Sequence, residues 1–143
     1  MFDKIIGTGG NIMAEKAKVL VVDDHNGVLE SFKEILRIKD YDVSGFSNGK
    51  EALESMKTAK YDFAFVDLKM PEMDGIEVLK RIKETDPSVE VIIVTAYASE
   101  ESFANAITLG AMEYLRKPFL MGEVYALSER ALRKRREKLA GGK

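Results

Sequence analysis

The residues best suited to chemistry in this sequence stand at the ends of four short apolar runs. They are Asp23 and Asp24, Asp67, Thr95 and Lys117. In an open parallel sheet, ligands bind beyond the carboxyl ends of the strands. A single strand end of this kind is usually only a solvated end, but four at the same edge indicate a site. We therefore expect these side chains to converge.

Three carboxylates at one edge repel one another, and a hard divalent cation relieves that repulsion. Mg²⁺ prefers oxygen ligands and usually takes one or two carboxylates together with water. Asp24 and Asp67 are the expected direct ligands, with Asp23 reaching the ion through water. The ammonium of Lys117 adds a second positive charge, so the site suits an anionic oxygen ligand.

A transferred phosphoryl group matches this set of charges, because its oxygens carry negative charge. A carboxylate can act as a nucleophile and form an aspartyl phosphate, and Asp67 is the candidate. Thr95 offers a hydroxyl to a phosphoryl oxygen, and Ala96 leaves space for the group to enter. The sequence thus predicts phosphoryl chemistry at Asp67.

The stretch 63–75 is the element that must position Asp67. Four apolar residues lead into Asp67 without alternation, which predicts a strand buried on both faces, as in a parallel sheet. Pro71 cannot continue a strand ladder or enter a helix interior. Asp74 and Gly75 form a turn pair in which Gly75 can take a positive φ. Asp67 is therefore expected at the mouth of a rigid strand, before a stiff loop.

The remaining pattern alternates strands with helices. Strands are predicted over 18–22, 41–46, 63–66, 89–94 and 112–115, with the second at an edge. Apolar residues at helical spacing lie within 28–36, 52–56, 76–82, 103–107 and 121–138. This pattern predicts an α/β fold with one parallel sheet covered by helices on both faces. We expect a flexible leader over 1–17 with Met13 as a candidate native start, one domain over 18–138, and a frayed tail or linker start over 139–143.

Composition excludes several classes of site. The net charge of −2 makes no overall electrostatic case for nucleic acid, and the absence of cysteine excludes disulfides, thiolate catalysis and cysteine zinc sites. A single histidine excludes a histidine-rich metal site. No apolar run reaches the roughly 18 residues of a membrane span, and the N-terminus lacks a secretory signal. The expected location is the cytoplasm.

The sequence resembles the receiver domain of two-component response regulators over roughly 18–138. The resemblance rests on four motifs in order: Val21-Val22-Asp23-Asp24, Asp67 with Met70-Pro71-Glu72-Met73-Asp74-Gly75, Val94-Thr95-Ala96, and Lys117-Pro118-Phe119. It implies a doubly wound (βα)5 flavodoxin-like fold with strand order 2-1-3-4-5.

The resemblance also implies roles for individual residues. Asp67 would accept a phosphoryl group from a sensor histidine kinase or a phosphotransfer protein. Asp23, Asp24 and Asp67, with the backbone carbonyl of Lys69, would hold Mg²⁺. Lys117 would contact the phosphoryl group and precede a cis peptide bond at Pro118.

The family's conformational switch is implied at two further positions. On phosphorylation, Thr95 would bond a phosphoryl oxygen and Tyr114 would turn inward. The surface of the fourth helix, fifth strand and fifth helix would then change partners, with a phosphorylation-dependent homodimer as one outcome. Ala96, Tyr97 and Lys69 flank the phosphoryl position, and the last two are expected to set its lifetime. His25 is expected to be a surface histidine.

Other functions stay open at this point. An aspartyl-phosphate phosphohydrolase commonly places a second acid two residues after the nucleophile, where this chain has Lys69. A phosphorylation-independent binding module of the same fold is the remaining class. A basic cluster, Arg133-Lys134-Arg135-Arg136 with Lys138, would suit nucleic acid or an acidic partner, but cations near a helix C-terminus explain it more simply. No recognisable DNA-binding helix pair follows, so direct nucleic-acid binding is not expected.

Overall fold

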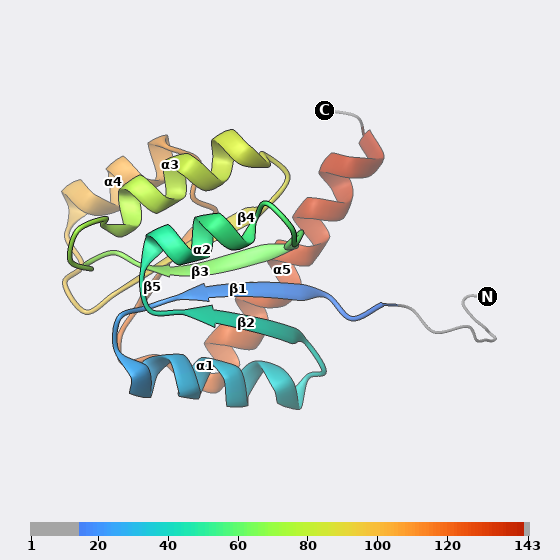
Figure 1. Ribbon diagram of the computed structural model, residues 1–143, viewed down its shortest axis with the longest axis horizontal. Coiled ribbons are helices and arrows are strands. Elements are labelled where there is room, and N and C mark those ends of the chain that lie inside the picture. The colour runs from blue at the N-terminus through green and yellow to red at the C-terminus, as the bar shows by residue number, and fades with distance from the viewer. Residues whose placement is uncertain (1–14, 142–143) are drawn as a thin grey trace.

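The computed structural model describes residues 15–141 of the 143-residue chain. The expectations for residues 1–14 and 142–143 lie outside this part. Within it, five parallel strands form one sheet in the order β2-β1-β3-β4-β5 (Figure 1). The predicted α/β fold and its strand order are confirmed. The strands are β1 (Lys18–Val22), β2 (Asp42–Phe46), β3 (Phe63–Asp67), β4 (Glu90–Thr95) and β5 (Glu113–Arg116).

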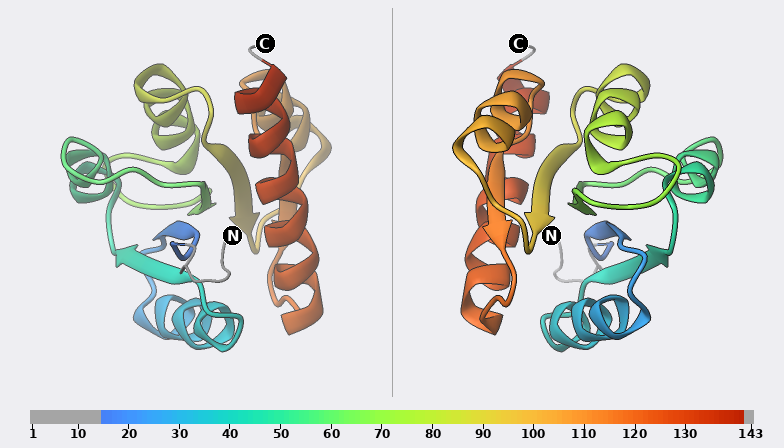
Figure 2. Two further views of the ribbon diagram at one scale, coloured as in Figure 1. Left: turned by 90° about the vertical axis from the view of Figure 1, so that its right-hand side faces the viewer. Right: turned by 90° about the vertical axis from the view of Figure 1, so that its left-hand side faces the viewer.

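Five helices cover the two faces of the sheet (Figure 2). Helices α1 and α5 pack on one face, and α2, α3 and α4 pack on the other. This arrangement follows from right-handed crossovers between parallel strands. The helices are α1 (Asn26–Ile38), α2 (Gly49–Ser55), α3 (Gly75–Thr85), α4 (Glu100–Thr108) and α5 (Met121–Gly141).

The central strands are buried on both faces. Every residue of β3 and β4 is buried, whereas β2 at the sheet edge has no fully buried residue. The apolar side chains therefore divide into two cores, one on each side of the sheet, each closed by its own helices. Because β1 and β3 are fixed from both sides, the residues at their carboxyl ends emerge from a rigid support.

Short polar side chains start three of the helices. Asn48 accepts a hydrogen bond from the N–H of Glu51 at α2, and Asp74 accepts one from the N–H of Glu77 at α3. Ser99 begins α4 and forms a reciprocal capping box with Ser102. Such caps satisfy backbone N–H groups that have no partner inside the helix.

Helix α5 extends to Gly141, beyond its predicted end at Lys138. Two residues of the basic cluster bind acids of this same chain. Arg135 pairs with Asp62 at 2.9 Å, and Lys138 pairs with the buried Glu90 at 2.5 Å. These two ion pairs therefore link α5 to the amino-terminal ends of β3 and β4. No helix of the described residues is both long and apolar enough to cross a membrane.

Candidate functional site

The polar residues predicted to converge do meet at the carboxyl edge of the sheet. Asp23 follows β1, Asp67 ends β3, and Lys117 follows β5. The Nζ of Lys117 lies 2.8 Å from Oδ2 of Asp23 and 3.5 Å from Oδ1 of Asp67. Strand adjacency explains the convergence, because β3 lies between β1 and β4, and β4 pairs with β5. The Lys117–Pro118 peptide bond is cis.

Two of the carboxylates are almost completely removed from solvent. Asp23 is 1% exposed and Asp67 is 3% exposed. The pKa of Asp67 is raised to about 6, first by burial and then by the nearby Asp23 charge, while Lys117 opposes the shift. One lysine therefore only partly offsets the charge of this carboxylate cluster.

The cluster fits a hard divalent cation. Asp23, Asp24, His25 and Asp67 each offer a ligand atom, and these atoms lie within 4.8 Å of one another. Oδ2 of Asp67 is buried and receives no hydrogen bond from the described residues. A buried carboxylate oxygen without a donor is costly, and a bound cation would remove that cost.

A shallow pocket of about 220 Å³ opens directly over Asp67. Its walls include Lys69, Ala96 and Tyr97, the residues expected to flank the phosphoryl position. Ala96 and Tyr97 are exposed, as is Lys69. Ala96, with its small side chain, lines the same pocket as the Asp67 carboxylate.

Thr95 and Tyr114 lie in different surroundings. Thr95 is fully buried, and its hydroxyl accepts a hydrogen bond from the N–H of Tyr97 at 2.9 Å. The Tyr114 hydroxyl is hydrogen-bonded to the Ser102 hydroxyl of α4, and its ring meets Phe103 edge-on at 5.6 Å. Tyr114 thus lines a separate hollow of about 330 Å³ between α4 and β5.

Gly75 has a structural role that the sequence argument missed. Gly75 does not use the positive φ that is open to glycine, which among the described glycines only Gly110 adopts. A Cβ at Gly75 would instead lie 2.2 Å from the carbonyl oxygen of Asp67 and 2.8 Å from the Cα of Leu68. Glycine is required because α3 begins directly against the backbone that carries Asp67.

His25 also lies closer to the site than expected. Its side chain is 68% exposed, yet Nδ1 lies 3.3 Å from an oxygen of Asp23 and 3.2 Å from an oxygen of Asp24. The only sequence signal was its position directly after the acid pair. That position alone does not specify which way the imidazole turns.

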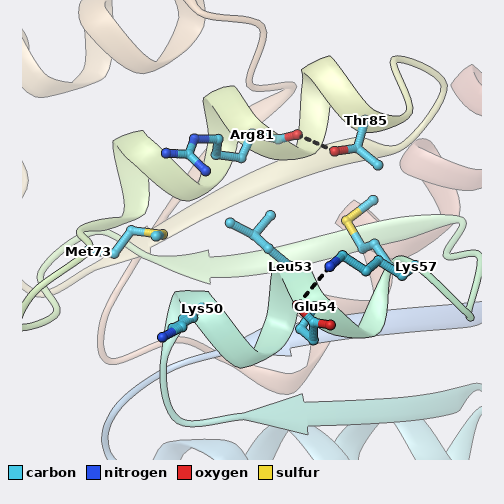
Figure 3. A pocket seen from close by; sticks show the side chains of 8 residues that line it. Lys50, Leu53, Glu54, Lys57, Met73, Arg81 and Thr85 are labelled. Atoms are coloured by element: carbon cyan, nitrogen blue, oxygen red, sulfur yellow. Dashed lines mark hydrogen bonds and ion pairs between the residues drawn. The ribbon is translucent and has the colours of Figure 1, made fainter.

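A larger hollow of about 490 Å³ lies between α2 and α3 (Figure 3). Lys57 and Glu54 form an ion pair beside it at 3.2 Å, and Thr85 donates to the carbonyl oxygen of Arg81. None of the site residues predicted from the sequence lines it. The residues expected to carry the chemistry therefore lie at the carboxylate edge and not in this hollow.

Comparison with known proteins places these features in context. The sequence model of the response regulator receiver domain family matches residues 19–129 of this chain. Transcriptional regulatory protein ZraR of Escherichia coli (strain K12) is 39% identical over 114 residues, covering 80% of this chain and 26% of that protein. Sporulation initiation phosphotransferase F of Bacillus subtilis (strain 168) is 36% identical over 107 residues, covering 75% of this chain and 86% of that protein.

A solved structure agrees in fold. The CheY-like response regulator receiver domain protein from Methanospirillum hungatei JF-1 has a TM-score of 0.83 at 28% identity, covering 87% of this chain and 99% of that one. The present chain spans about a quarter of the length of ZraR. The likeness to ZraR therefore concerns that part of the regulator alone.

Proposed function

This chain belongs to the response regulator receiver domain family, and we propose that it is a phosphorylation-controlled signalling module with Asp67 as its phosphoryl acceptor. Receiver domains act in two-component signal transduction with histidine kinases or phosphotransfer proteins. The observation that carries the proposal is the buried Asp67 carboxylate with Lys117 and the acid pair beside it. That arrangement joins a nucleophile to the cationic Lys117 and to two further carboxylates that could share a divalent cation with it.

The transfer step uses the carboxylate of Asp67 as the nucleophile. An oxygen of Asp67 bonds to phosphorus as the phosphorus–nitrogen bond of a phosphohistidine breaks, and the histidine nitrogen leaves with the bond's electron pair. Lys117 is placed to neutralise charge that develops on the phosphoryl oxygens. Because the pKa of Asp67 is about 6 in the metal-free protein, the nucleophilic form predominates at neutral pH.

We further propose that Asp23, Asp24 and Asp67, with the backbone carbonyl of Lys69, hold Mg²⁺. The ion would offset carboxylate repulsion and neutralise phosphoryl oxygens. The chain's own contribution is to hold its carboxylates close together at the carboxyl ends of β1 and β3 before the donor arrives. Lys69 and Tyr97, at the pocket entrance, are the residues we propose to limit attack by water and so slow autodephosphorylation.

The output we propose is a change on the face formed by α4, β5 and α5. Phosphorylation would draw the Thr95 hydroxyl from the Tyr97 N–H toward a phosphoryl oxygen, and Tyr114 would leave Ser102 and turn inward. Such a shift would alter what this face binds. A second copy of the chain is one partner consistent with the proposal.

Incubation with acetyl phosphate and Mg²⁺ is expected to add one phosphoryl group to the wild-type chain. Intact mass spectrometry measures the adduct. Asp67→Asn keeps the size of the side chain but removes the nucleophile, so it should show none, and a chelator should suppress the wild-type adduct. Equal labelling of Asp67→Asn would refute the acceptor assignment. Steady release of phosphate from a phosphomonoester would favour a phosphohydrolase. If the chain forms no adduct and also fails to bind beryllofluoride, a constitutive binding module would be favoured.

Thr95→Ala is expected to separate phosphoryl binding from the conformational response. Without the hydroxyl, beryllofluoride should still bind at Asp67, but the Tyr114 ring resonances should shift less than half as far as in wild type. Two-dimensional NMR of the aromatic region measures both events. Tyr114→Phe, which keeps the ring against Phe103, identifies the resonances. A full Tyr114 response in Thr95→Ala would exclude Thr95 as the coupling residue.

A further inference from the structure

We propose that His25 is a nitrogen ligand of the divalent cation at the carboxylate edge, and that it shifts the preference of the site from Mg²⁺ toward Mn²⁺. The inference rests on the proposed cation site, and it adds one nitrogen ligand to the oxygen ligands proposed there. Imidazole nitrogen suits transition-metal ions, whereas Mg²⁺ favours carboxylate, carbonyl and water oxygens. One added nitrogen ligand would therefore strengthen Mn²⁺ binding selectively.

The contacts of His25 converge on the acid pair. Its backbone N–H donates to Oδ1 of Asp23 at 2.9 Å, which fixes the chain beside that carboxylate. Its Nδ1 lies 3.3 Å from the same oxygen and 3.2 Å from Oδ1 of Asp24. In an octahedral complex with bonds of about 2.1 Å, neighbouring ligand atoms lie about 3 Å apart. The imidazole therefore stands at the spacing of an adjacent ligand.

Helix capping does not explain this side chain. His25 is the N-cap residue of α1, but its side chain makes no capping hydrogen bond. Serine, threonine, aspartate and asparagine are the residues that cap effectively. The imidazole instead turns toward Asp23 and Asp24, so its position is explained by the acid pair and not by the helix.

A second observation supports a cation at these residues. Oδ2 of Asp67 is buried and lacks a hydrogen-bond donor among the described residues. Asp67 also offers one of the four ligand atoms that lie within 4.8 Å of one another, together with His25 and the acid pair. Because the imidazole lies at the exposed rim and the Asp67 carboxylate at the buried base, the two would approach a cation from different sides. His25 would thus complete a ligand set that the carboxylates begin.

The test measures metal binding directly, without any phosphorylation. Mn²⁺ is titrated into the full chain by electron paramagnetic resonance, and Mg²⁺ affinity is obtained by competition. His25→Ala should weaken Mn²⁺ binding about tenfold and change Mg²⁺ binding less than threefold. Val28→Ala, which alters a wall of the same pocket without removing a ligand atom, should leave the ratio of the two affinities unchanged.

Pulsed electron paramagnetic resonance supplies the decisive signature. Wild type with bound Mn²⁺ should show nitrogen-14 coupling of a coordinated imidazole, and His25→Ala should lose it. Mn²⁺ binding without that coupling, or an equal loss of Mg²⁺ and Mn²⁺ affinity in His25→Ala, would overturn this inference and leave the proposed function intact. Wild-type Mn²⁺ and Mg²⁺ binding no stronger than that of Asp67→Asn would overturn both the inference and the proposed cation site.

Discussion

Gly75→Ala is expected to destabilise the fold by about 3 kcal/mol or more and to abolish phosphoryl acceptance at Asp67. A Cβ at this position would overlap the carbonyl oxygen of Asp67 at 2.2 Å, and it would also press on the backbone of Leu68. These are backbone atoms of a buried strand and its exit, so they cannot rotate aside as a flexible side chain could. Relief of the overlap requires α3 or Asp67 itself to move.

Gly27→Ala is the matched control for this substitution. Gly27 also lies in the first turn of a helix, but a Cβ there would meet nothing within 4 Å. Alanine is a better helix former than glycine by about 0.8–1.0 kcal/mol, so this variant should be as stable as wild type or more stable. Urea unfolding measures stability, and intact mass after acetyl phosphate measures acceptance. The steric argument fails if Gly75→Ala matches Gly27→Ala in both measurements.

Asp67→Asn is expected to make the metal-free protein more stable, by an amount that grows with pH. The pKa of Asp67 is about 6 in the fold, above the ordinary 3.8. The folded state therefore holds the proton more tightly, and the stability that the carboxyl contributes is lost as pH rises from about 4 through 6. Above that range, ionised Asp67 costs the fold about 3 kcal/mol, since each unit of pKa is worth about 1.4 kcal/mol.

Urea unfolding with a chelator present measures this effect. The gain from Asp67→Asn should approach about 3 kcal/mol at pH 7.5 and fall to about 1 kcal/mol at pH 4.5. Asp40→Asn is the control, because Asp40 is an exposed carboxylate whose ion pair with Lys16 lies on the surface. A gain that is the same at both pH values, or no gain, would show that repulsion and burial at Asp67 do not limit stability.

Much of the fold was readable from short stretches of sequence. The apolar runs that form β1, β3 and β4 predicted buried parallel strands, and the residues after them predicted which edge carries the chemistry. These signals are local, because a strand that is buried on both faces consists of consecutive apolar residues. The boundaries were within a residue or two for these strands, whereas α5 continued three residues beyond its predicted end.

The sequence by itself determined the strand–helix alternation and the presence of Asp23, Asp67 and Lys117 at strand ends, and the family resemblance supplied the strand order. Tertiary structure alone decided several contacts that no local pattern contains. Arg135 meets Asp62 although 73 residues separate them, so part of an apparent basic patch stabilises the fold.

The same reason applies around the site. Gly75 is required by the approach of α3 to the backbone of Asp67, and the imidazole of His25 is turned toward two carboxylates. The type of a residue limits which groups it can bind. Which groups lie near it in space is determined only when the helices pack onto the sheet. Periodicity therefore predicted the elements, while packing set the partners of each polar group.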